Sequence, residues 1–133
     1  MEVEFGFRKE RSDLFGFVWR PVARVTVIYR RRRVPQLFYV DSGADVTLIP
    51  KSVGDLFGLT LASPKQIKEI IGIGEQGVPI VIRRLQLQVG SRILSARVAW
   101  ALLEEVSLLL GRLDCFRLFD ITFRKNQATV FKW

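Results

Sequence analysis

The sequence predicts an all-β protein, and three observations carry that prediction. Short stretches of apolar and β-branched residues recur along the 133-residue chain, many of them alternating with polar residues. Gly, Pro, Asn or Ser bounds these stretches, as expected of turns between antiparallel strands. Apolar residues at helical spacing occur in only two short segments. Because 49% of the residues are hydrophobic, a chain of this length can build one compact core, and we expect residues 1–133 to form a single domain.

The expected strands follow one another along the chain. They are predicted near residues 18–29, 37–41, 46–50, 66–71, 79–89, 93–101, 106–109, 119–124 and 128–132. The arginine run 30–33 lies between the first two strands, where a hairpin turn is expected. Gly90-Ser91 predicts a tight hairpin turn, and Lys125-Asn126 predicts a looser one. Residues 1–16 have mixed charge and no clear period, so they could form an N-terminal arm.

One or two short helices interrupt this pattern. Val53, Leu56 and Phe57 have helical spacing, and Gly58 supplies a stop signal for a helix that follows Pro50. A second short helix is predicted over residues 112–118. Neither segment is long enough to change the all-β class.

The composition excludes several kinds of chemistry. The chain has no histidine, which removes Ser-His-Asp and Cys-His catalysis and every histidine-based metal site. Cys115 is the single cysteine, so an intrachain disulfide cannot form, and we expect this residue in the core. We expect no metal and no other cofactor. The remaining possibilities are catalysis by carboxylate, lysine or tyrosine side chains, or no catalysis at all.

Charge and hydropathy bear on partners and location. No apolar run approaches the roughly 18 residues of a membrane-spanning helix, and residues 1–5 lack the features of a secretory signal. We therefore expect a cytoplasmic protein with no membrane contact. The net charge of +8 would suit a nucleic-acid binder. However, the only dense basic run is 30–33, and solvated turn charge is the favoured interpretation, so a nucleic-acid partner is not expected.

The segment Asp41-Ser42-Gly43 is the candidate for chemistry. An apolar stretch precedes Asp41 and another follows Asp45, so one strand delivers the carboxylate into a turn and a second strand leaves it. Gly43 allows the backbone to turn tightly beside the carboxylate, and Ser42 can hydrogen-bond to a second such turn. Two carboxylates that meet in this way can share one proton and hold a water. Alone, the tripeptide is expected by chance in roughly one in twenty chains of this length.

Three segments in the same order resemble the retropepsins, the retroviral-type aspartic peptidases, over roughly residues 18–133. The first is Asp41 to Pro50 with its apolar flanks, the second is the glycine-containing stretch 70–78, and the third is 108–112, Leu-Leu-Leu-Gly-Arg. The resemblance implies a closed β-barrel-type acid-protease subunit with a flap hairpin over the substrate. The chain resembles free-standing cellular or prokaryotic members of the family more than an excised viral enzyme.

The resemblance also implies a set of site residues. The catalytic segment is Asp41, Ser42 and Gly43, and the substrate-binding residues are Ala44, Asp45, Leu48, Ile70, Gly72, Ile73, Gly74, Leu109 and Arg112. Ile73 and Gly74 are expected at the flap tip, and Arg112 is expected to pair with Asp45. The expected flap stretch 70–78 departs from several viral members of the family at Ile71, where those proteins have another glycine.

The chain carries a single Asp-Ser/Thr-Gly, so a catalytic pair must come from two chains. A homodimer would place the two Asp41 residues on its twofold axis. We therefore expect a homodimeric aspartic endopeptidase that hydrolyses extended polypeptide segments. Two alternatives stay open: a catalytically weak retropepsin-like domain that binds peptides or only dimerises, and a basic β-barrel that binds single-stranded nucleic acid.

Overall fold

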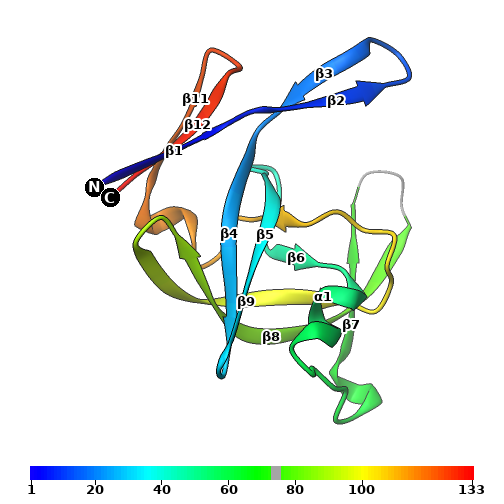
Figure 1. The fold of residues 1–133 in the computed structure, drawn as a ribbon. Coiled ribbons are helices and arrows are strands. Elements are labelled where there is room, and N and C mark those ends of the chain that lie inside the picture. The colour runs from blue at the N-terminus through cyan, green and yellow to red at the C-terminus, as the bar shows by residue number, and fades with distance from the viewer. Residues whose placement is uncertain (73–75) are drawn as a thin grey trace.

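A computed structural model of the chain describes residues 1–72 and 76–133, and strands account for most of it (Figure 1). The predicted flap-tip residues Ile73 and Gly74 lie outside the described residues. In chain order the elements are β1 (Glu2–Gly6), β2 (Arg8–Ser12), β3 (Gly16–Arg20), β4 (Val22–Tyr29), β5 (Arg32–Val40), β6 (Thr47–Ile49), α1 (Lys51–Leu56), the 3₁₀ turn η1 (Pro64–Gln66), β7 (Ile67–Ile71), β8 (Gly77–Val89), β9 (Arg92–Ala101), β10 (Leu109–Leu110), the 3₁₀ turn η2 (Phe116–Leu118), β11 (Asp120–Arg124) and β12 (Ala128–Lys132).

The body of the protein is a closed six-stranded barrel. Its strands follow the order β4-β5-β10-β6-β9-β8, and β8 pairs back onto β4 through Thr26↔Gln88, Val27↔Leu87 and Ile28↔Gln86. β7 adds to the outer edge of β8. The predicted all-β class and closed barrel are therefore confirmed.

Alternation along the strands fills the barrel with apolar side chains. On β4, Ala23, Val25 and Val27 are fully buried, whereas the intervening Arg24 is exposed. Phe38 on β5 and Leu87 on β8 are also fully buried and belong to the same cluster. Burying a side chain of valine or leucine size stabilises a fold by about 1.5–3 kcal/mol. The barrel is thus a packed core, and any binding site must lie at its surface.

The N-terminal residues form regular strands, where the sequence pattern had indicated an arm. β1 pairs with β12, which also pairs with β11, in a three-stranded sheet. The two termini lie side by side (Figure 1), because the Met1 ammonium group donates to the Trp133 carbonyl over 2.9 Å. β2 and β3 form a separate hairpin that projects beyond the barrel. The single strand predicted over 18–29 is wrong, since Pro21 separates β3 from β4.

Three further predictions need correction in extent. The strand expected over 37–41 is β5, which begins at Arg32 and so includes the last two residues of the arginine run. The strand expected over 106–109 shrinks to the two residues of β10, and the helix expected over 112–118 contains only η2. The helix predicted after Pro50 is present as α1. The arginine run 30–33 lies at the predicted β4–β5 turn, where Arg30 has a positive φ of 55°. Within the described ranges, no helix combines the length and apolar character needed to cross a membrane.

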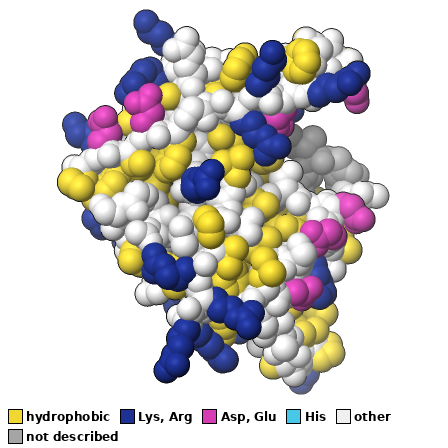
Figure 2. Space-filling view, viewed as in Figure 1, with side chains coloured by type: hydrophobic (Ala, Val, Ile, Leu, Met, Phe, Trp, Pro, Cys, Tyr) yellow, Lys and Arg dark blue, Asp and Glu magenta, His cyan; other side chains and the backbone are white. Residues whose placement is uncertain are grey.

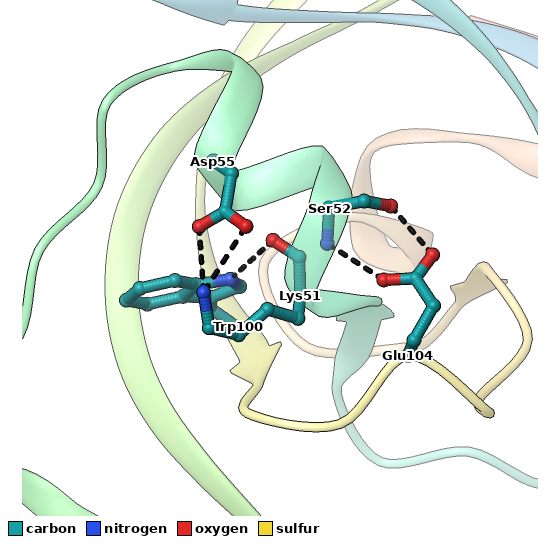
Figure 3. A network of polar contacts seen from close by, with 5 residues as sticks. All are labelled: Lys51, Ser52, Asp55, Trp100 and Glu104. Carbon is teal, nitrogen blue, oxygen red and sulfur yellow. Dashed lines mark hydrogen bonds and ion pairs between the residues drawn. The ribbon is translucent and has the colours of Figure 1, made fainter.

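Polar contacts attach α1 to the end of β9 (Figure 3). The Trp100 indole N–H donates to the Lys51 carbonyl over 3.2 Å, and Glu104 accepts from the Ser52 amide over 2.9 Å. Hydrogen bonds from the Ser52 hydroxyl and amide lower the pKa of Glu104. Gly54 is essential to this packing, because a Cβ there would stand 2.1 Å from Trp100 Nε1. α1 follows β6 directly, so these contacts also fix the far end of the strand that leaves the Asp41 loop.

Candidate active site

The Asp41 turn is built by local hydrogen bonds at the end of β5. The Asp41 amide donates to the Leu110 carbonyl over 3.1 Å, and the Ala44 amide donates to the Asp41 carbonyl over 3.2 Å. The Gly43 amide donates to Asp41 Oδ1 over 2.9 Å. A Cβ on Gly43 would stand 3.2 Å from that oxygen, tighter than ordinary contact, so glycine leaves the carboxylate its place. The turn therefore presents a half-buried carboxylate in a defined position.

β10 threads between the two strands that flank this turn. It pairs in parallel with β5 through Leu109↔Tyr39 and antiparallel with β6 through Leu109↔Leu48. Gly111 follows directly, and a Cβ there would lie 2.4 Å from both the carbonyl carbon and oxygen of Val46. Only glycine fits at this position, because the two backbones pass too closely for a Cβ atom. Thr47, a buried polar residue, completes the crossing by accepting a hydrogen bond from the Gly111 amide over 3.1 Å.

Arg112 spans the Asp41 loop from behind. Its guanidinium meets Asp45 Oδ1 at 2.5 Å, which is the expected ion pair, and donates to the Ser42 carbonyl over 2.8 Å. The Arg112 amide also donates to the Ala44 carbonyl over 3.0 Å. The Asp45 side chain is 89% exposed, so the ion pair itself adds little stability in water. The backbone hydrogen bonds therefore give the loop its shape, and the Arg112 side chain reinforces it.

A cleft of about 520 Å³ runs along this loop. Most of the predicted site residues line this cleft: Asp41, Gly43, Ala44, Asp45, Leu48, Ile70, Gly72 and Leu109. Three further lining residues, Val46, Ile71 and Val78, were not predicted as site residues. Ser42 and Arg112 contribute to the loop behind the cleft. The cleft thus gathers residues from segments far apart in the sequence beside the Asp41 carboxylate.

The β7–β8 hairpin forms the wall that faces the loop. Its strands pair up to Ile71↔Gly77, and the hairpin contributes Ile70, Ile71, Gly72 and Val78 to the cleft. Leu48 and Leu109 belong to the barrel side of the same cleft. Apolar walls of this kind accept the side chains of an extended peptide while its backbone pairs like an added strand. The hairpin occupies the position in which the sequence predicts a flap.

A second cleft of about 530 Å³ also has Asp41 in its lining. Its lining residues are Glu10, Arg20, Pro21, Tyr39, Val40, Asp41, Ser107 and Leu109. The Tyr39 hydroxyl donates to Glu10 Oε2 over 2.6 Å, and Arg20 Nε lies 3.1 Å from Glu10 Oε1. Burial, and then the bond to Glu10, raises the pKa of Tyr39. Sequence reasoning missed Glu10 and Arg20, because only the folded β2–β3 hairpin brings them beside Asp41.

Other candidate groups are placed away from the cleft. Cys115 is fully buried, as expected, and burial raises the pKa of its thiol to about 12. Within residues 1–72 and 76–133, no three or more acidic or cysteine side chains gather in a way that could hold a metal ion.

The arginine run 30–33 is exposed, and Figure 2 shows basic side chains at the lower end of the molecule, where the β4–β5 turn lies. Part of the run has structural partners: Arg32 bonds the Leu56 carbonyl, and Arg33 bonds the Gln88 side chain. These contacts favour the interpretation of the run as turn charge that anchors the hairpin.

Comparison with solved structures identifies the fold. The crystal structure of a retropepsin-like aspartic protease from Rickettsia conorii superimposes with a TM-score of 0.67 at 16% sequence identity, covering 98% of both chains. EIAV protease in complex with the inhibitor HBY-793 superimposes with a TM-score of 0.56 at 20% identity, covering 70% of this chain and 82% of the viral chain. Comparison of the sequence with protein-family models and with curated proteins gives no match. The chain therefore has the retropepsin-like fold.

Proposed function

We propose that this chain is one subunit of a homodimeric aspartic endopeptidase. The observation that carries the proposal is the Asp41 carboxylate, half-buried in the cleft and fixed by the Gly43 amide and by the threaded β10. Apolar side chains from the barrel and from the β7–β8 hairpin surround it. The likeness in fold to two aspartic proteases supports the same conclusion.

The proposed reaction needs a second carboxylate, which a second copy of the chain would supply. Only two carboxylates, Asp41 and Asp45, are among the described residues that line the main cleft, and Asp45 is paired with Arg112. A twofold axis beside Asp41 brings the same residue from both copies together, since residues at an isologous contact meet themselves. The dimer, rather than the single chain, is then the catalytic unit.

In the proposed mechanism, the two Asp41 carboxylates share one proton, because two negative charges at short distance are unfavourable. The ionised carboxylate takes a proton from a bound water as the water oxygen attacks the peptide carbonyl carbon. The protonated carboxylate donates to the developing oxyanion. A proton then passes to the amide nitrogen as the C–N bond breaks, which releases a carboxylic acid and an amine. Leu48, Ile70 and Leu109 are the proposed contacts for substrate side chains.

The first test is cleavage of casein between pH 4 and 8 by the wild type and by Asp41→Asn, each with and without pepstatin. We expect the substitution to lower kcat by about three orders of magnitude or more, as loss of a central catalytic group does. Asp120→Asn, an exposed position outside both clefts, is the matched control and should cleave like the wild type. Undiminished cleavage by Asp41→Asn would refute an aspartic mechanism at this site. A wild type that stays folded and dimeric yet inert would favour the peptide-binding alternative.

A mixing experiment tests the origin of the pair. If each active unit needs Asp41 from both copies, subunits exchanged between equal amounts of wild type and Asp41→Asn should retain about a quarter of the wild-type activity. A catalytic unit that uses only one chain should retain about half. Sedimentation velocity on the same mixture shows whether dimers are present at the assay concentration. A monomer that still cleaves would remove the dimeric mechanism.

A further inference from the structure

The substrate cleft does not end at Asp41. The cleft below the β7–β8 hairpin and the cleft beside the β2–β3 hairpin both have Asp41 and Leu109 in their lining. They therefore adjoin at these two residues, and an extended ligand that passes Asp41 would contact both, so we call them the two halves of the substrate groove. Figure 1 shows the β2–β3 hairpin at the upper right of the molecule and β7 at the right of the barrel.

The two halves differ in chemistry. The half under β7–β8 is lined mainly by apolar side chains, whereas the other half contains Glu10, Arg20, Tyr39 and Ser107. The Glu10 side chain is only 18% exposed, and it is held by the Tyr39 hydroxyl and by Arg20 and Arg8. A carboxylate with this many partners is a fixed part of the groove.

The balance of charge in this cluster is positive. One carboxylate, Glu10, faces two guanidinium groups, Arg8 at 3.6 Å and Arg20 at 3.1 Å. Of these two arginines Arg20 lines the cleft, which the Asp41 carboxylate also borders. Arg20 makes its closest approach through Nε, so its two terminal amino groups can still donate to another acceptor. The Arg20 side chain is 52% exposed and lines the groove, so a ligand can reach it. A planar pair of N–H donors matches a carboxylate in geometry as well as charge.

We infer that Glu10 and Arg20 of the β2–β3 hairpin form a specificity subsite that selects an aspartate or glutamate side chain of the substrate close to the scissile bond. Glu10 acts as a positioning residue, because it orients the guanidinium that makes the contact. A basic substrate side chain does not fit as well, since Glu10 is already paired and two arginines surround it. The inference rests on the proposed function and names its substrate preference.

The position of Tyr39 in the sequence places this subsite close to the scissile bond. Tyr39, which bonds Glu10, stands two residues before Asp41 on the same chain. An extended peptide advances about 3.3 Å per residue, so an acidic side chain within two positions of the cleaved bond can reach the subsite.

The test uses peptides that differ only by glutamate or glutamine at one of the two positions on each side of the cleaved bond. We expect the wild type to cleave one glutamate peptide with a kcat/KM about tenfold or more above that of its glutamine counterpart, as expected of a hydrogen bond between charged groups. Arg20→Gln should bring this ratio close to one, and Arg20→Lys should keep part of it. Arg24→Gln makes the same charge change on the exposed side of β4, outside both clefts, and should leave the wild-type ratio unchanged.

A binding measurement separates this inference from the proposed function. In the Asp41→Asn background, fluorescence anisotropy of the labelled peptides should show tighter binding of the glutamate peptide, and Arg20→Gln should remove the difference. Circular dichroism of each variant confirms that it is folded. If the wild type cleaves both peptides equally, or Arg20→Gln keeps the preference, the subsite is refuted while the peptidase stands. If nothing is cleaved but Arg20 still governs glutamate binding, the subsite stands and the peptidase does not.

Discussion

Replacing Gly111 by alanine should disturb the Asp41 loop without touching its carboxylate. The new Cβ would lie 2.4 Å from the carbonyl atoms of Val46 and 2.8 Å from the Thr47 amide nitrogen, where ordinary contact begins at 3.4 Å. One backbone must therefore move by about 1 Å (3.4 − 2.4). Overpacking of this kind costs about 1–3 kcal/mol, and alanine recovers roughly 0.4–1 kcal/mol by restricting the unfolded chain. We expect a net loss of about 1–2 kcal/mol.

The effect on cleavage should be larger than the effect on stability. A displacement of about 1 Å at a reacting group can lower the rate roughly a hundredfold. Urea and thermal denaturation measure the first effect, with an expected fall in Tm of roughly 3–10 °C, and peptide cleavage measures the second. Gly6→Ala is the control, because no atom lies within 4 Å of its added Cβ. Unchanged unfolding free energy and unchanged kcat in Gly111→Ala would show that the crossing does not need glycine.

Three further predictions concern other parts of the fold. Gly54→Ala should lower the urea midpoint, because the clash with Trp100 at 2.1 Å outweighs the helix preference for alanine of about 1 kcal/mol; a higher midpoint would contradict this. Hydrogen bonds from Arg97 lower the pKa of Asp114, so its ionised form stabilises the fold above the unfolded pKa, about 4, and this contribution is lost as pH falls. The stability gap between wild type and Asp114→Asn should therefore be widest near pH 7 and should close towards pH 2; a pH-independent gap is the contrary result. Cys115 should resist thiol reagents until the protein is unfolded in urea, and rapid labelling of the native protein would show that it is accessible.

Local patterns in the sequence predicted the parts of the fold that depend on neighbouring residues. The hairpin turns at Gly90 and at Lys125-Asn126 are present, and all three residues have positive φ values of 58°, 46° and 58°. The strand, turn and strand around Asp41 were also predicted, because they too depend on neighbouring residues. The break at Pro21 was not predicted, although proline has no amide hydrogen to continue a ladder and the signal was therefore present in the sequence.

Contacts between distant segments could not be predicted from those patterns. β1 finds its partner at the other end of the chain, in the register Glu2↔Lys132, and no local period encodes that pairing. Glu10 and Arg20 line the same cleft as Asp41 only because the β2–β3 hairpin is placed beside the end of β5. For the segment around Asp41, the resemblance in three ordered motifs supplied the long-range information that composition and period lack.

The threading of β10 also determines at which stage of synthesis the Asp41 loop can take its shape. The backbone bonds that shape the Asp41 loop come from Leu110, Arg112 and Leu113, and Asp41 is separated from Leu110 by 69 positions (110 − 41). A chain emerging from the ribosome folds from its N-terminus, so the Asp41 motif is exposed long before the residues that position it are synthesised. Until then the carboxylate has no defined partners. Translation itself therefore delays the formation of the Asp41 loop, and a nascent or truncated chain carries the motif without its geometry.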